Sequence, residues 1–168
     1  MSFTVRGDDL VGGRGAPLPN RVYLATIEVA EAQQKDNGKQ VWRQYGNLRD
    51  AESGLTEFEQ ADGSTYRIGN RKVSSWSWWQ HSNPDAERIG QRELFREAVA
   101  LGLVEKPEKG QEAVFPFEEA EEYATEIVGR EVKIKTRLRQ KQGKDKKPIV
   151  DDEGNPVFEA GVIEWLAI

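Results

Sequence analysis

The sequence of 168 residues predicts a mainly β fold with helices, in which five strands and one main helix follow in a recognisable order. Two observations carry this prediction. Strand-forming segments recur within residues 21–80 and 132–168, and Asn37-Gly38 is a strong hairpin signal within the first group. A segment with helical spacing separates the two groups. The predicted order is three strands, a helix, and two strands, with an additional short helix before the fourth strand.

The first three strands are predicted to form an antiparallel meander. Residues 21–29 are rich in strand formers and give the first strand, and residues 40–49 give the second. Residues 50–64 are polar and acidic, which predicts a surface excursion containing a short extra hairpin. Strand character returns at residues 65–68 and then at residues 72–80, the third strand.

The helices are predicted from their start and stop signals. Asn83-Pro84 combines a capping residue with a proline at the first helical position, and apolar residues then recur at helical spacing until Gly102. A linker broken by prolines and a glycine follows. The short second helix is predicted over residues 118–128 and ends at Gly129.

The fourth strand, residues 132–139, alternates cations with apolar residues or threonine. A period of two directs one face into a core and projects four cations from the other, namely Lys133, Lys135, Arg137 and Arg139. A basic loop containing Lys141 follows, and a final strand is predicted over residues 157–168. Residues 130–148 carry a charge of +7, against −12 for the remainder. The alternative interpretation is a solvated face or a guarded edge strand.

A tryptophan cluster occupies the third strand. Trp76, Trp78 and Trp79 lie among serines, directly after Arg71 and Lys72. In a strand Trp76 and Trp78 share one face and Trp79 takes the other. Aromatic rings beside cations are what a site needs to stack unpaired bases and hold their phosphates. The alternative is that these rings belong to the core or contact a partner protein.

The predicted order of elements is that of an OB-fold, a five-stranded Greek-key barrel with a helix between strands three and four. Such barrels bind ligands across strands two and three and the loops that join strands one to two and four to five. The aromatic and basic clusters fall at these places. The nucleic-acid-binding residues predicted here comprise Trp42, Arg43 and Tyr45 on strand two, with Arg71, Lys72, Trp76, Trp78, Trp79, Lys133, Lys135, Arg137, Arg139 and Lys141.

Composition limits the other classes. The chain has no cysteine and no apolar run long enough to span a membrane, and we expect a soluble protein of the cytoplasm. Residues 1–19 are predicted to form a flexible arm and residues 20–168 a single domain. We predict no enzyme activity, metal or cofactor. His81 is the only histidine, and Asp85 and Glu131 fall on elements too far apart in the predicted fold to form a nuclease metal site.

Three segments resemble a known family. They are Leu24-Ala25-Thr26-Ile27 leading to Asn37-Gly38-Lys39, Arg92-Glu93-Leu94-Phe95 ending at Ala100-Leu101-Gly102-Leu103, and Ile127-Val128-Gly129-Arg130-Glu131-Val132. In hydrophobic pattern and loop placement the chain resembles small single-stranded DNA-binding proteins of bacteriophages, a family catalogued as a domain of unknown function. The tryptophan cluster and residues 50–64 depart from that family.

The resemblance implies sequence-tolerant binding of single-stranded DNA during phage replication or recombination, in the cytoplasm of the host. It also implies replication or recombination proteins of the phage or host as a second class of partner. A protein-interaction module that docks on such a partner through the tryptophans is the alternative function. Only the resemblance favours DNA over RNA.

Overall fold

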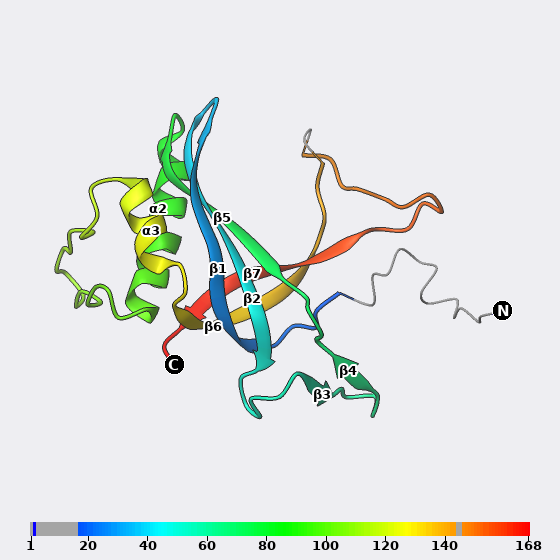
Figure 1. Cartoon of the computed structure of the whole chain (residues 1–168). Coiled ribbons are helices and arrows are strands. Elements are labelled where there is room, and N and C mark those ends of the chain that lie inside the picture. The colour runs from blue at the N-terminus through cyan, green and yellow to red at the C-terminus, as the bar shows by residue number, and fades with distance from the viewer. Residues whose placement is uncertain (1, 3–16, 144–145) are drawn as a thin grey trace.

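The computed structural model describes residues 2, 17–143 and 146–168. Its centre is a five-stranded antiparallel sheet in the order β5-β2-β1-β6-β7 (Figure 1). The strands of this sheet are β1 (Val22–Lys35), β2 (Gly38–Asp50), β5 (Val73–His81), β6 (Glu131–Gln140) and β7 (Phe158–Leu166). The remaining elements are β3 (Glu57–Glu59), β4 (Thr65–Arg67), α2 (Pro84–Ala100) and α3 (Ala120–Ile127).

The predicted element order is confirmed, including the extra hairpin in the acidic excursion. β3 and β4 pair with each other as a separate two-stranded sheet. The turn at residues 36–37 joins β1 to β2, as the Asn-Gly signal predicts. β1 runs six residues beyond its predicted end because its ladder with β2 continues to the turn.

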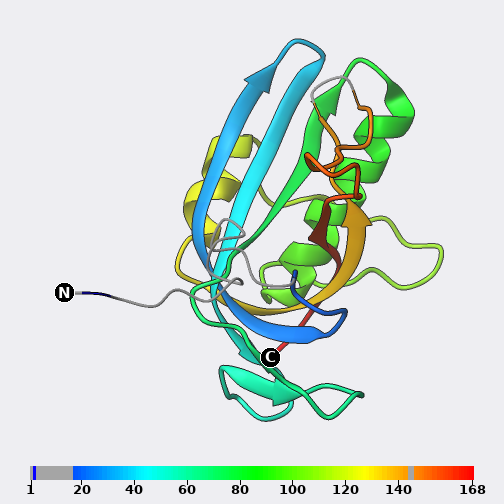
Figure 2. The same ribbon diagram turned by 90° about the vertical axis from the view of Figure 1, so that its right-hand side faces the viewer.

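The main sheet is strongly curved (Figure 2). β1 pairs with β2 along most of its length but with β6 only through residues 22–26, so the sheet bends around β1. The edge strands β5 and β7 approach to within 8 Å between Cα atoms, but no backbone ladder joins these two described strands. The architecture is therefore a mainly β, five-stranded antiparallel sheet with two helices, open at one seam.

The two helices pack on the same side of the sheet (Figure 1). Asn83 caps α2 as predicted, since its side chain accepts a hydrogen bond from the Asp85 amide at 2.9 Å. Gly102 has a φ of 75°, the left-handed conformation that suits the residue after a helix end. α2 crosses β5 so closely that a Cβ on Gly90 would lie 2.4 Å from the backbone N and O of Trp78.

The core lies between the inner face of the sheet and the helices. Alternate residues of β1 and β6 are fully buried there, for example Tyr23, Ile27 and Ile134. Leu18, which precedes the first strand, also belongs to this core. Most of the predicted arm, residues 1 and 3–16, lies outside the described residues.

Candidate nucleic-acid interface

At its centre, residues 75–77, β5 has the opposite polarity to an ordinary strand that covers a core. Ser75 and Ser77 face inward and are buried, whereas the side chain of Trp76 is 46% exposed on the outer face. A strand that packs on a core normally directs its large apolar residues inward. The small serines let α2 pack closely on β5 while the Trp76 ring remains available to a ligand.

The ring of Trp76 lies beside a groove between β5 and the end of the β6–β7 loop, which we name the aromatic groove. Its volume is about 660 Å³. The part of its lining that can contact a nucleic acid consists of Arg71, Lys72, Trp76, Lys141 and Phe158. Phe158 is 50% exposed and supplies a second open ring. Residues separated by about seventy positions in the sequence therefore meet here.

Backbone hydrogen bonds fix the loop side of the aromatic groove. The Lys141 amide donates to the Val157 carbonyl at 2.7 Å, and the Lys141 carbonyl accepts from the Ile149 amide at 2.8 Å. The Val157 amide in turn donates to the Ile149 carbonyl at 3.1 Å. These bonds hold Lys141 next to Phe158, so the groove has an ordered wall on this side.

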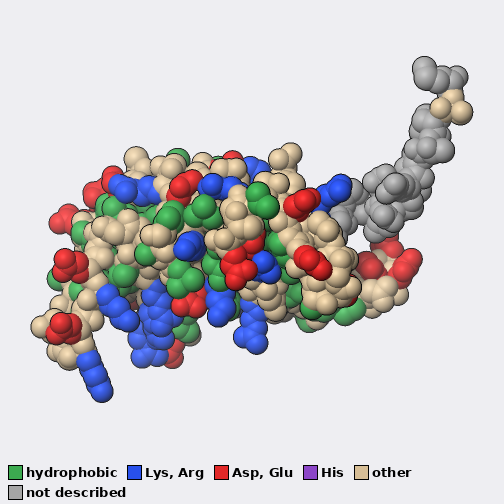
Figure 3. All heavy atoms as spheres, turned by 90° about the horizontal axis from the view of Figure 1, so that it is seen from below, with side chains coloured by type: hydrophobic (Ala, Val, Ile, Leu, Met, Phe, Trp, Pro, Cys, Tyr) green, Lys and Arg blue, Asp and Glu red, His purple; other side chains and the backbone are tan. Residues whose placement is uncertain are grey.

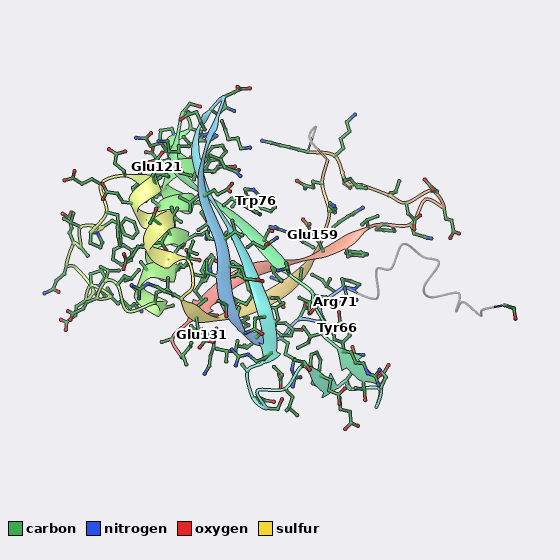
Figure 4. All side chains as sticks on the ribbon, in the orientation of Figure 1. Tyr66, Arg71, Trp76, Glu121, Glu131 and Glu159 are labelled. Carbon is green, nitrogen blue, oxygen red and sulfur yellow. The ribbon has the colours of Figure 1, made fainter. Side chains whose placement is uncertain are left out.

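The cations on the β5 side are held by neighbours. Figure 4 labels Arg71 beside Tyr66, and the guanidinium carbon of Arg71 lies 5.5 Å from the centre of that ring. Lys72 Nζ pairs with Glu28 Oε1 at 2.7 Å, on a part of the surface where both side chains are partly exposed. Exposed pairs of this kind are weak, so a phosphate can compete for Lys72.

The opposite wall contains two carboxylates, Asp151 and Glu159. Glu159, on β7, pairs with Arg139 Nε at 3.6 Å. The groove is therefore a mixed surface in which cations outnumber carboxylates rather than a purely basic channel. Of the predicted site residues, Arg71, Lys72, Trp76 and Lys141 are brought together here.

Arg43 and Tyr45 were predicted to contact nucleic acid, but both side chains are fully buried on the inner face of β2. Arg43 Nε lies 3.2 Å from the carboxylate of Glu97 on α2, and the Tyr45 hydroxyl donates a short hydrogen bond to the same carboxylate. Tyr123 also donates to Glu97, at 2.7 Å, and Trp165 Nε1 donates to the Tyr45 hydroxyl at 2.8 Å. These residues join the helices to the sheet, and we remove Arg43 and Tyr45 from the candidate interface.

Burial and charge act in opposite directions in this inner cluster. Burial is the largest single influence on the pKa of Arg43 and by itself would lower it, but Glu97, Tyr45 and Tyr123 together outweigh burial, and the pKa is raised. Burial raises the pKa values of the Tyr45 and Tyr123 hydroxyls well above their usual range. At neutral pH the Arg43 guanidinium therefore keeps its charge and the two phenols stay protonated.

The other predicted aromatic residues occupy two environments. Trp42 lies directly opposite Trp76 on the outer face but is half-buried, with its Nε1 enclosed. Trp78 is half-buried and its ring contacts the His81 ring edge-on, with 4.3 Å between ring centres. Trp79 takes the face opposite to Trp76, as predicted; this is the inner face, where its ring packs against Phe115 with 5.5 Å between ring centres. Trp76 is the most open ring of the cluster.

The alternation predicted for β6 is confirmed over most of the strand. Val132, Ile134 and Thr136 are buried, and the cations between them lie on the outer face. These cations are Lys133, Lys135, Arg137 and Arg139. The sequence could not show that β7 brings carboxylates opposite them, with Lys135 4.0 Å from Glu164 and Arg139 paired with Glu159. Seen from below, Lys and Arg side chains form a row along the edge where α2 and β6 lie (Figure 3).

Sequence reasoning did not select Phe158 as part of the site. Its position after a turn gives no sign that the loop returns it to the same groove as Trp76, because that depends on the hydrogen bond between the Lys141 amide and the Val157 carbonyl.

Among the described residues, no group of three or more acidic or histidine side chains is arranged to hold a metal ion. No helix in the described part of the chain is long and apolar enough to cross a membrane.

No protein-family model matches the sequence, and no curated protein is significantly similar to it.

Proposed function

We propose that the protein binds single-stranded DNA in the aromatic groove, without strong sequence preference. The observation that carries the proposal is the outward-facing Trp76, which lies with Phe158 and the cations Arg71, Lys72 and Lys141 around one groove. Open rings and nearby cations are the two components of sequence-tolerant single-strand binding. The preference for DNA over RNA, and a role in phage replication or recombination, rest on the family resemblance described above.

The strand order supports an OB-type fold as part of this proposal. In that fold the third strand and the loop between strands four and five contribute to the ligand surface. β5 and the β6–β7 loop are the corresponding elements here, and both line the aromatic groove. The open seam between β5 and β7 then lies where the single strand would enter.

The proposed mechanism uses two kinds of contact. Bases stack on Trp76 and Phe158, each stack contributing about 1 to 3 kcal/mol. Arg71, Lys72 and Lys141 contact phosphates, with Lys72 exchanging its bond to Glu28 for a phosphate oxygen. Neutralising about three phosphates predicts a slope near −2 when the logarithm of the association constant is plotted against the logarithm of salt concentration.

A specific observation favours the second candidate, a docking site for a partner protein. Glu28 and Glu159 pair with cations at or beside the groove, which reduces its net positive charge and suits a mixed protein interface. In that case Trp76 would act as an aromatic anchor of the interface.

The two functions separate in a titration of labelled oligo-dT against the protein, followed by fluorescence anisotropy at several salt concentrations. Single-strand binding predicts saturable binding that weakens with salt at the slope given above, with much weaker binding of a duplex of the same length. An absence of oligo-dT binding at low salt would contradict the proposal and leave protein docking. Equal affinity for duplex would contradict the stacking mechanism.

A further inference from the structure

A second groove lies between α2 and the end of β7. We name it the arginine groove. Its volume is about 960 Å³, larger than that of the aromatic groove. One wall carries Arg88, Arg92 and Arg96, and Lys106 follows from the loop after the helix. The sequence did not predict a site at these residues, because they alternate with acidic residues along the helix.

The arginines form a row that is slightly inclined to the axis of α2. Residues four apart in a helix lie on the same face, so Arg88, Arg92 and Arg96 follow one another along the groove over about 12 Å. All three side chains are exposed. Arg88 pairs with Asp85 at 3.3 Å, whereas within the described part of the chain neither Arg92 nor Arg96 has an ion pair within 4.0 Å. Two guanidinium groups are thus available to an anionic ligand.

The β7 side of the groove, opposite the arginines, is mainly aliphatic. Ile163 is 46% exposed there, and Leu166 and Ala167 extend the apolar surface. The one carboxylate in this lining, Glu164, lies 4.0 Å from Lys135, so the cations of the groove still outnumber its carboxylates. The aromatic residues of the groove are not open to stacking, since Trp165 is buried and Phe95 packs towards Phe115 with 6.1 Å between ring centres. Bases need open rings, so this lining favours a ligand with aliphatic side chains.

We propose that the arginine groove binds a segment of a partner protein in which acidic and aliphatic residues alternate. In an extended segment, successive side chains point to opposite sides. One side would then present carboxylates to Arg92 and Arg96 while the other packs on Ile163. Charge complementarity supports an acidic partner, since guanidinium groups form two-pronged hydrogen bonds with carboxylates. This site is separate from the aromatic groove and does not depend on the proposed DNA binding.

The test uses the full chain and a labelled peptide of about eight residues that alternates Asp and Leu, a length that spans the arginine row when extended. We expect saturable binding by fluorescence anisotropy and no binding of the peptide with Lys in place of Asp. The double variant Arg92→Gln/Arg96→Gln should weaken binding about tenfold. Ile163→Ser should weaken it independently, and the control Arg67→Gln/Lys35→Gln, which changes two exposed cations elsewhere, should not.

Three results would overturn the proposal. The first is no binding of the acidic peptide, and the second is binding that neither the double arginine variant nor Ile163→Ser weakens. The third is a loss of oligo-dT affinity in Arg92→Gln/Arg96→Gln as large as that in an aromatic-groove variant, because the arginine groove would then belong to the nucleic-acid path. Oligo-dT binding by the unmodified protein is measured separately, so failure of the DNA proposal would leave this test intact.

Discussion

Around Arg43 and Trp76, the two faces of the β2–β5 pair reverse the usual distribution of residue types. On the inner face a charged pair, Arg43 and Glu97, is fully buried with the Tyr45 hydroxyl. On the outer face the large ring of Trp76 is open to solvent, with Trp42 directly opposite. A fold selected only for stability would place these groups the other way round. The inner charges therefore hold the helices to the sheet, whereas the outer ring is free to contact a ligand.

Glu97→Gln should have the largest effect on stability and thereby test the inner face. The substitution leaves the Arg43 guanidinium buried without its counter-charge, and we expect the free energy of unfolding to fall by about 3 to 5 kcal/mol. Denaturant titration followed by circular dichroism measures this change. Glu122→Gln, on the exposed side of α3, is the matched control. A loss in Glu97→Gln no larger than in the control would contradict the structural role of the pair.

Gly90→Ala tests how closely α2 approaches β5. Alanine normally stabilises a helix interior by up to about 1 kcal/mol relative to glycine. Here the added Cβ would lie 2.4 Å from the backbone of Trp78, so we expect a net loss of about 1 to 3 kcal/mol. Thermal or chemical unfolding measures whether the free energy of unfolding falls or rises. A rise in Gly90→Ala would contradict the close contact between α2 and β5.

Trp76→Ala tests the outer face. Loss of one base stack should weaken oligo-dT binding by about 1 to 3 kcal/mol, or roughly five- to 150-fold. Because the ring is half-exposed, we expect the free energy of unfolding to change by no more than about 1 kcal/mol. Anisotropy and denaturation on the same preparation measure both quantities. Val114→Ala, at a strongly exposed apolar position, is the control for surface truncation. Large destabilisation with unchanged DNA affinity would reverse the assignment of the two faces.

The double variant Arg71→Gln/Lys141→Gln tests the phosphate contacts of the aromatic groove separately from base stacking. Removing two phosphate contacts should make the salt slope less steep by about 1.4. Arg67→Gln, an exposed arginine on β4 four residues away from Arg71, should leave the slope unchanged. The slope comes from oligo-dT titrations at several salt concentrations. Equal slopes in both variants would remove Arg71 and Lys141 from the phosphate path.

The smallest effect concerns Asp50, a second buried charge on β2. The Arg21 hydrogen bond, at 2.6 Å, holds the pKa of this carboxyl below its usual value. A lowered folded-state pKa gives stability that is present above the unfolded pKa of about 3.9 and is lost as the pH falls through the folded value. Asp50→Asn should therefore flatten the loss of stability below about pH 4. If the free energy of unfolding fell equally steeply with acid in Asp50→Asn and in the unmodified protein, this role of the Asp50 carboxylate in stability would be contradicted.

Most of the fold follows from the sequence because its signals are local. The Asn37-Gly38 turn, the Asn83 cap and the alternation in β6 each depend on neighbouring residues only. The burial of Arg43 could not be predicted in this way. The alternation of residues along β2 shows which side chains share a face with Arg43, but its buried partner Glu97 lies on a helix 54 residues later. Residue type alone assigned Arg43 to a phosphate contact. Phe158 was missed for the same reason, since a long loop brings it to Trp76.

The most direct test of the account is quenching of tryptophan fluorescence by oligo-dT in the unmodified protein and in Trp76→Phe. Phenylalanine retains a ring for stacking but removes the fluorophore at this position. We predict strong quenching of the unmodified protein and loss of most of it in Trp76→Phe, while anisotropy shows that the variant still binds. Equal quenching in the two proteins, or none at low salt in the unmodified protein, would contradict the claim that the outer face of β5 stacks bases on Trp76.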